Sequence, residues 1–159
     1  MTEESTPVTQ TDRPEKKRTP KNPGYQLAAH AVDAMLDKKA HDVVVIDLRG
    51  ISGVAEFFVL GTGDSDLQVR AIANSERDRI REQCDERVWH KEGLDRLEWV
   101  LLDYVDCVVH IFSKAKREHY DLERLWGEAP SERIPEDGSA ADVELLEAPR
   151  QAPRRASNA

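Results

Sequence analysis

The 159-residue sequence has few cysteines and no long apolar segment. Only Cys84 and Cys107 are present, no run of roughly 18 apolar residues occurs, and the first twenty residues lack the apolar stretch of a signal peptide. These absences exclude a membrane-spanning helix and predict a cytoplasmic protein. Because no secretion signal accompanies the cysteines, we expect both to be free and buried.

Large apolar side chains are scarce at both ends of the chain. Residues 1–23 contain no aromatic residue, and residues 131–159 contain only four apolar side chains larger than alanine. Such segments bury too little apolar surface to offset the entropy lost on ordering them. We therefore predict disordered tails over residues 1–23 and 131–159. Residues 24–130, which hold every Trp, Tyr and Phe, are predicted to form one folded domain.

The negative charge is concentrated in this predicted domain. The whole chain has a formal net charge of −8, and residues 24–130 carry 14 basic and 21 acidic side chains, a net of −7. A domain of that sign is repelled by nucleic-acid phosphates at long range, which disfavours broad non-specific nucleic-acid binding. A basic protein partner would be attracted instead.

The pattern of apolar residues alternates between helical and strand periods. It predicts helices over about 25–40, from Ser65 to about Cys84, and over 117–126, and strands over 43–48, 57–60, 88–89, 97–102 and 107–112. The last two strands are expected to form an antiparallel hairpin closed by residues 103–106. This order predicts an α/β or α+β fold, with a mixed sheet of about five strands flanked by helices.

Catalytic and metal-binding motifs are absent from the sequence. The five histidines are scattered singly, with no partner at metal-ligand spacing, and no nucleophile elbow or phosphate-binding loop is present. His110 could act as a general base, but a hydrogen-bonded histidine within the sheet is favoured. No catalytic residue, metal site or cofactor is predicted.

One turn offers an alternative to this non-enzymatic interpretation. Residues 61–66, Gly-Thr-Gly-Asp-Ser-Asp, lead from a predicted strand into a predicted helix, where anions bind, and the two aspartates could hold Mg²⁺ beside a nucleotide phosphate. Helix capping, with Ser65 and Gln68 spaced as a capping box, is the favoured interpretation. Asp103 and Asp106 are likewise favoured as turn residues over an acid–base pair.

Two aromatic residues of the predicted hairpin suggest a binding surface. Trp99 and Tyr104 lie close together in the sequence, and both could belong to the core. If one sheet face is open, their rings beside acidic residues would instead form a protein-binding surface, because such rings are frequent interface anchors.

Four collinear stretches resemble the ribosomal silencing factor (Iojap-related) family. They are KAHDVVVIDLRGIS (39–52), FFVLGTGDSDLQVRAIA (57–73), WVLLDYVDCVVHIF (99–112) and REHYDLERLW (117–126). The resemblance implies a non-enzymatic factor that binds the large ribosomal subunit through its L-fourteen-family ribosomal protein. It would block joining of the small subunit and lower translation when nutrients are scarce. It also implies a fold like that of nucleotidyltransferases, without the catalytic machinery.

The resemblance also implies partner-binding residues. These are Trp99, Asp103, Tyr104 and Asp106, with Arg117 and Tyr120 as neighbours. Trp99 and Tyr104 would be anchors, and the aspartates would pair with Lys or Arg of the partner. The chain departs from the family pattern at Val105, where glycine is usual, and near Leu67, where a basic residue is frequent. Residues 16–18 could touch ribosomal RNA, and a homodimer hiding the aromatic face would compete with ribosome binding.

Overall fold

A computed structural model describes residues 21–147 of the chain. Expectations for residues 1–20, including the basic residues 16–18, and for residues 148–159 lie outside this part. The elements in chain order are α1 (Gly24–Asp37), β1 (His41–Asp47), β2 (Phe57–Gly63), α2 (Asp66–Cys84), β3 (His90–Glu92), β4 (Trp99–Asp103), β5 (Cys107–Ser113), α3 (Lys114–His119), α4 (Leu122–Leu125), β6 (Ser131–Ile134) and the 3-10 helices η1 (Ala140–Asp142) and η2 (Glu144–Leu146).

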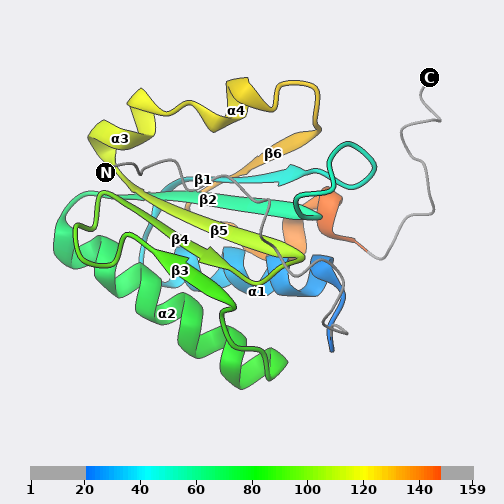
Figure 1. The fold of residues 1–159 in the computed structure, drawn as a ribbon, viewed down its shortest axis with the longest axis horizontal. Helices are drawn as coiled ribbons and strands as arrows, with labels where there is room; N and C mark the ends of the chain where they lie inside the picture. Colours follow the sequence, from blue (N-terminus) through cyan, green and yellow to red (C-terminus); the bar gives the residue numbers. More distant parts are fainter. Residues whose placement is uncertain (1–20, 148–159) are drawn as a thin grey trace.

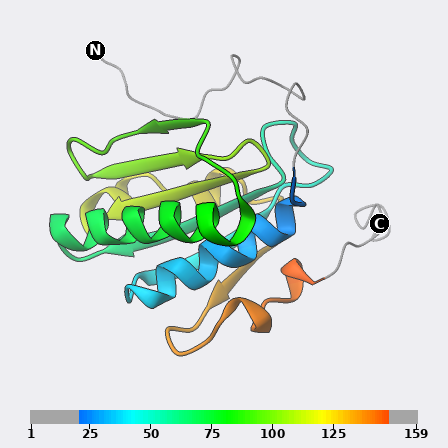
Figure 2. The same ribbon diagram turned by 90° about the horizontal axis from the view of Figure 1, so that it is seen from below.

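The six strands form one mixed sheet in the order β3-β4-β5-β2-β1-β6. Strands β2 and β5 are parallel, and every other neighbouring pair is antiparallel. Helices α1 and α2 lie on one face of the sheet, while α3 and α4 lie on the other (Figures 1 and 2). The predicted mixed sheet flanked by helices and the predicted β4–β5 hairpin are therefore confirmed, with six strands in place of about five.

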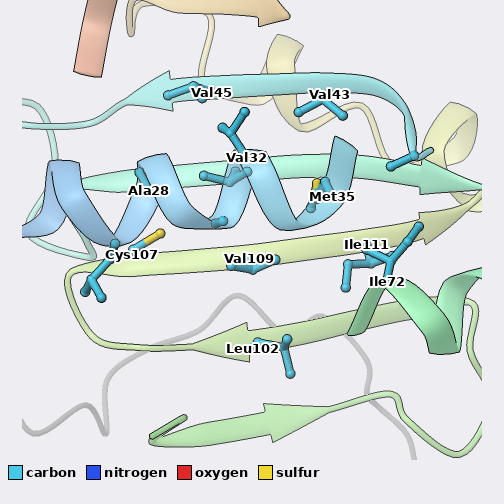
Figure 3. Packing of buried hydrophobic residues seen from close by; sticks show 14 of the residues in the cluster. Ala28, Val32, Met35, Val43, Val45, Ile72, Leu102, Cys107, Val109 and Ile111 are labelled. Atoms are coloured by element: carbon cyan, nitrogen blue, oxygen red, sulfur yellow. The ribbon is translucent and has the colours of Figure 1, made fainter. Parts of the chain in front are cut away.

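The larger core lies between the sheet and helices α1 and α2. The apolar residues of α1 recur every three or four positions, so one side of the helix is buried, and Figure 3 shows Ala28, Val32 and Met35 against the strands. Cys84 and Cys107 are both free and buried in this layer, as predicted. No helix within residues 21–147 is long and apolar enough to cross a membrane.

The N-terminus of α2 is capped as the sequence predicts. Ser65 is the N-cap, and its hydroxyl accepts a hydrogen bond from the backbone N–H of Gln68 at 3.1 Å. The Gln68 side-chain oxygen accepts in return from the N–H of Asp64 at 2.6 Å, one residue before the N-cap. Two backbone donors at the start of the helix are thereby satisfied.

The predicted helix over 117–126 is wrong as a single element. The chain forms α3 and α4, separated at Tyr120, whose backbone is extended. The carboxylate of Asp121 caps α4 by accepting from the N–H of Arg124 at 3.3 Å. By accepting this N–H, the Asp121 side chain favours the start of a new helix at Leu122. This local effect ends the first helix before Tyr120, although the apolar residues continue at helical spacing.

The predicted C-terminal tail is wrong over residues 131–147. Strand β6 pairs with β1, and Ile134, Val143 and Leu146 are buried in the core beside α1. The Glu132 carboxylate accepts hydrogen bonds from the backbone N–H groups of Glu144 and Leu145, which fixes η2 against β6. The segment has few apolar residues, but it orders because most of them are buried against a sheet edge that the rest of the chain supplies.

Candidate protein-binding site

A pair of aromatic rings lies partly exposed on the sheet face that carries α3. The ring centroids of Trp99 in β4 and Tyr120 after α3 are 4.6 Å apart, and both side chains are half-buried. The fully buried Phe112 supports the Trp99 ring at 4.9 Å. We call Trp99, Tyr120 and Phe112 the aromatic platform. Rings that are partly exposed on a rigid base can bury further apolar surface against a partner without rearrangement.

Trp99 is also held by a hydrogen bond. Its Nε1–H donates to Nδ1 of His110 in β5 at 3.1 Å, which confirms the expectation of a hydrogen-bonded sheet histidine. Burial, together with the nearby positive charge of Arg117, lowers the pKa of His110 to about 3. The imidazole is therefore neutral at physiological pH, and its Nδ1 lone pair accepts the Trp99 indole N–H.

Tyr104, expected as a second anchor, is a core residue. Side chains alternate along β4, so Val100, Leu102 and the following Tyr104 face the α1–α2 layer, whereas Trp99 faces the opposite layer. Tyr104 is only 2% exposed. The expectation that its ring anchors a partner is wrong for this reason, and the alternative core interpretation holds.

The hairpin aspartates are involved in the turn. The Oδ1 atom of Asp103 accepts from the N–H of Val105 at 2.7 Å, and the carbonyl of Asp106 accepts from the N–H groups of Glu56 and Phe57. Asp103 is buried, and Asp106 is half-buried. Strand β4 separates Asp103 from Trp99 by four residues, or about 13 Å. The hairpin and the aromatic platform therefore lie at opposite ends of β4.

Arg117, expected near the interface, points inward. Its guanidinium donates to the Thr62 hydroxyl at 2.8 Å and to the Glu123 carboxylate at 3.0 Å, and its side chain is 9% exposed. These bonds connect β2, α3 and the start of α4. Arg117 thus holds the segment that carries Tyr120 in place, rather than presenting a charge to solvent.

Helix packing explains the glycines of the turn at residues 61–66. A Cβ atom at Gly61 would collide with the Met35 side chain of α1, and one at Gly63 would lie 2.9 Å from Cγ2 of Val69 in α2. Neither glycine has a positive φ. Among residues 21–147, no group of three or more His, Cys, Asp or Glu side chains is arranged to hold a metal ion. The turn therefore offers no positive support for a nucleotide site.

Comparison with known proteins decides the family. The family model described as "Ribosomal silencing factor during starvation" matches residues 20–159. The chain belongs to this ribosomal silencing factor family. The ribosomal silencing factor RsfS of Bacillus subtilis is 46% identical over 108 residues, which cover 66% of this chain and 86% of that protein. A mouse relative, "Mitochondrial assembly of ribosomal large subunit protein 1", is 26% identical over 117 residues, covering 67% of this chain and 51% of that protein.

Solved structures show the same family fold. A crystal structure from Chromobacterium violaceum has 35% sequence identity and a TM-score of 0.62, and covers 64% of this chain and 84% of its own. A second, from Bacillus halodurans, has 41% identity and a TM-score of 0.56, and covers 69% and 95%. The likeness to nucleotidyltransferases stays a prediction.

In this ribosomal silencing factor homologue, the support beneath Trp99 was not among the features predicted from the sequence. His110 and Phe112 are two residues apart on β5, so both face the same layer, and Trp99 pairs directly with Phe112. Aligning the two strands of the predicted hairpin would have placed these three rings together. The position of Tyr120 could not be found in this way, because it depends on how α3 packs back onto the sheet.

Proposed function

We propose that this protein is a non-enzymatic factor that binds the large ribosomal subunit in the cytoplasm. Its docking partner would be the ribosomal protein of the L-fourteen family, and the bound factor would block joining of the small subunit. Translation would then fall when nutrients are limiting. Membership of the ribosomal silencing factor family supports the general function, and the name of the mouse relative refers to the same subunit.

The aromatic platform is the observation that supports a docking role. Trp99 and Tyr120 are partly exposed next to each other, Phe112 supports the Trp99 ring, and both side chains pack against the buried cluster of this layer. The chain as a whole has a net charge of −8, so at long range a basic ribosomal protein would be attracted and ribosomal RNA repelled. A rigid aromatic surface on an acidic domain suits a basic protein partner better than a phosphate backbone.

Co-sedimentation with ribosomal particles tests the proposal. The purified protein is mixed with isolated large subunits, isolated small subunits or both, and the particles are separated on gradients. We expect binding to large subunits only, and fewer assembled ribosomes when both subunits are present. Trp99→Ala should weaken binding by roughly 30-fold, the effect of losing an anchor residue of about 2 kcal/mol.

Leu67→Ala provides the matched control. Leu67 is a 76% exposed apolar side chain on α2, in the layer opposite the aromatic platform, so its loss should leave binding unchanged. The oligomeric state of the free protein is measured first, because a homodimer formed through the platform would compete with the subunit. Binding to neither subunit, or equal binding of Trp99→Ala and the unmodified protein, would contradict the proposal.

A further inference from the structure

His110 is a buried polar residue to which the proposed function assigns no role. It lies in the middle of β5 with 1% of its surface exposed, on the layer that contains the aromatic platform. Its ring contacts Phe58, with centroids 4.6 Å apart, and lies nearly parallel to Phe112 at 6.2 Å. The strand register makes Leu101 the direct neighbour of His110, so Trp99 is its diagonal neighbour.

The hydrogen bond between the two residues can run in only one direction. An indole N–H is a donor and never an acceptor, so Nδ1 of His110 must carry a lone pair where Trp99 Nε1 approaches it at 3.1 Å. The proton of the neutral imidazole is then on Nε2. A doubly protonated imidazole would oppose two N–H groups and break the bond, and both burial and Arg117 disfavour that form.

The tilted ring contacts alone do not define the orientation of the Trp99 indole. Phe112 and Tyr120 contact its ring at centroid distances of 4.9 and 4.6 Å, which restricts the plane of the ring. An indole rotated about its Cβ–Cγ bond could keep comparable ring contacts while presenting a different edge to solvent. The bond to His110 distinguishes these orientations, because only one of them brings Nε1 to an acceptor.

We propose that His110 is a positioning residue for ribosome docking, which fixes the Trp99 indole in the one orientation that the partner protein recognises. The inference rests on the proposed function and adds to it a residue that does not touch the partner. Because the indole N–H donates to His110 within the protein, the partner would contact only the apolar face and edge of the ring. A rotated indole would present its N–H to the interface without an acceptor, which costs binding energy.

Two substitutions at His110 separate positioning from packing. His110→Leu removes the acceptor and replaces the imidazole with an apolar side chain of similar bulk. His110→Asn places its Oδ1, also an acceptor, close to the position of Nδ1. Trp99→Phe removes the donor and keeps an aromatic ring. His90→Leu, at an exposed histidine of β3, is the matched control.

Binding to large subunits and the indole N–H resonance of Trp99 are measured for each variant. The resonance is assigned by its absence in Trp99→Phe. We expect His110→Leu to weaken binding by about fivefold to tenfold and to speed hydrogen exchange at the Trp99 indole, because an indole N–H that faces leucine has no acceptor and only a minor fraction of the protein then keeps the orientation that binds. His110→Asn should restore slow exchange and most of the binding. In a Trp99→Phe background, His110→Leu should cause no further loss.

The outcomes distinguish this inference from the proposed function. If Trp99→Ala weakens binding but His110→Leu binds like the unmodified protein, positioning by His110 is refuted and the docking proposal stands. An equal loss from His110→Leu with and without the Trp99 indole would show a purely structural role and also refute it. If the unmodified protein binds no subunit, the docking role fails, and the positioning role fails with it. Should His110→Leu not fold, His110→Asn and Trp99→Phe complete the test.

Discussion

Val105 occupies a backbone conformation that suits glycine far better than valine. Its φ is +76°, and the N–H of Asp106 donates to the carbonyl of Tyr104 across it at 2.9 Å. This is a γ-turn of the rare positive-φ type, which is strained for any residue with a Cβ atom. The position at which the family resemblance implies glycine thus has a backbone conformation in which glycine is relaxed and valine is not. Val105→Gly should therefore stabilise the protein.

The expected size of the effect follows from three contributions. Relief of the positive φ is worth roughly 2 kcal/mol. Against it stand about 0.7 kcal/mol for the greater freedom of glycine in the unfolded chain, and about 0.5 kcal/mol for the lost contacts of a half-buried isopropyl group. The net gain is about 1 kcal/mol. In a domain of this size it raises the melting temperature by roughly 3–6 °C.

The assay is urea and thermal unfolding of the unmodified protein, Val105→Gly and Val105→Ala. Val105→Ala is the control, because alanine loses the isopropyl contacts but keeps the Cβ atom that causes the strain. We expect the glycine variant to be the most stable, and the alanine variant to lie within about 0.5 kcal/mol of the unmodified protein. A glycine variant no more stable than the alanine variant would refute the idea that strain is stored at this position.

Two further predictions concern stability. Glu76 on α2 is fully buried, neither of its carboxylate oxygens has a hydrogen-bond partner within residues 21–147, and burial raises its pKa well above 4.5. The stability that the protonated Glu76 contributes is therefore complete below about pH 4.5 and is lost as the pH rises. Because glutamine does not titrate, the stability of Glu76→Gln relative to the unmodified protein should increase between about pH 5 and pH 8. Urea midpoints measure this, and a constant difference, or the same trend in the exposed Glu82→Gln, would contradict it. Ending the chain at Pro130 removes β6 and the buried side chains after it, and should cost at least about 3 kcal/mol or abolish cooperative unfolding, relative to a chain ending at Glu147. Equal melting curves for the two chains would show that residues 131–147 add no stability.

Local patterns predicted most of the secondary structure. The helical stripe of α1, the cap at Ser65 and the β-branched run of β1 each depend on residues that are neighbours in the sequence. These features form under local rules of backbone and side-chain geometry. Prediction failed where a long-range partner decides the outcome. Ile134 looks like an isolated apolar residue in a polar tail until β1 is available to pair with β6.

The same division applies to the candidate site. The sequence by itself determined the fold class, the acidic character of the domain and the presence of Trp99 in a hairpin strand. Only the tertiary structure decided that Tyr104 is buried, that Arg117 points inward and that His110 holds the Trp99 indole. The physical reason is that alternation along a strand sorts side chains onto two faces, but the helices that later pack on each face decide which of them stays exposed.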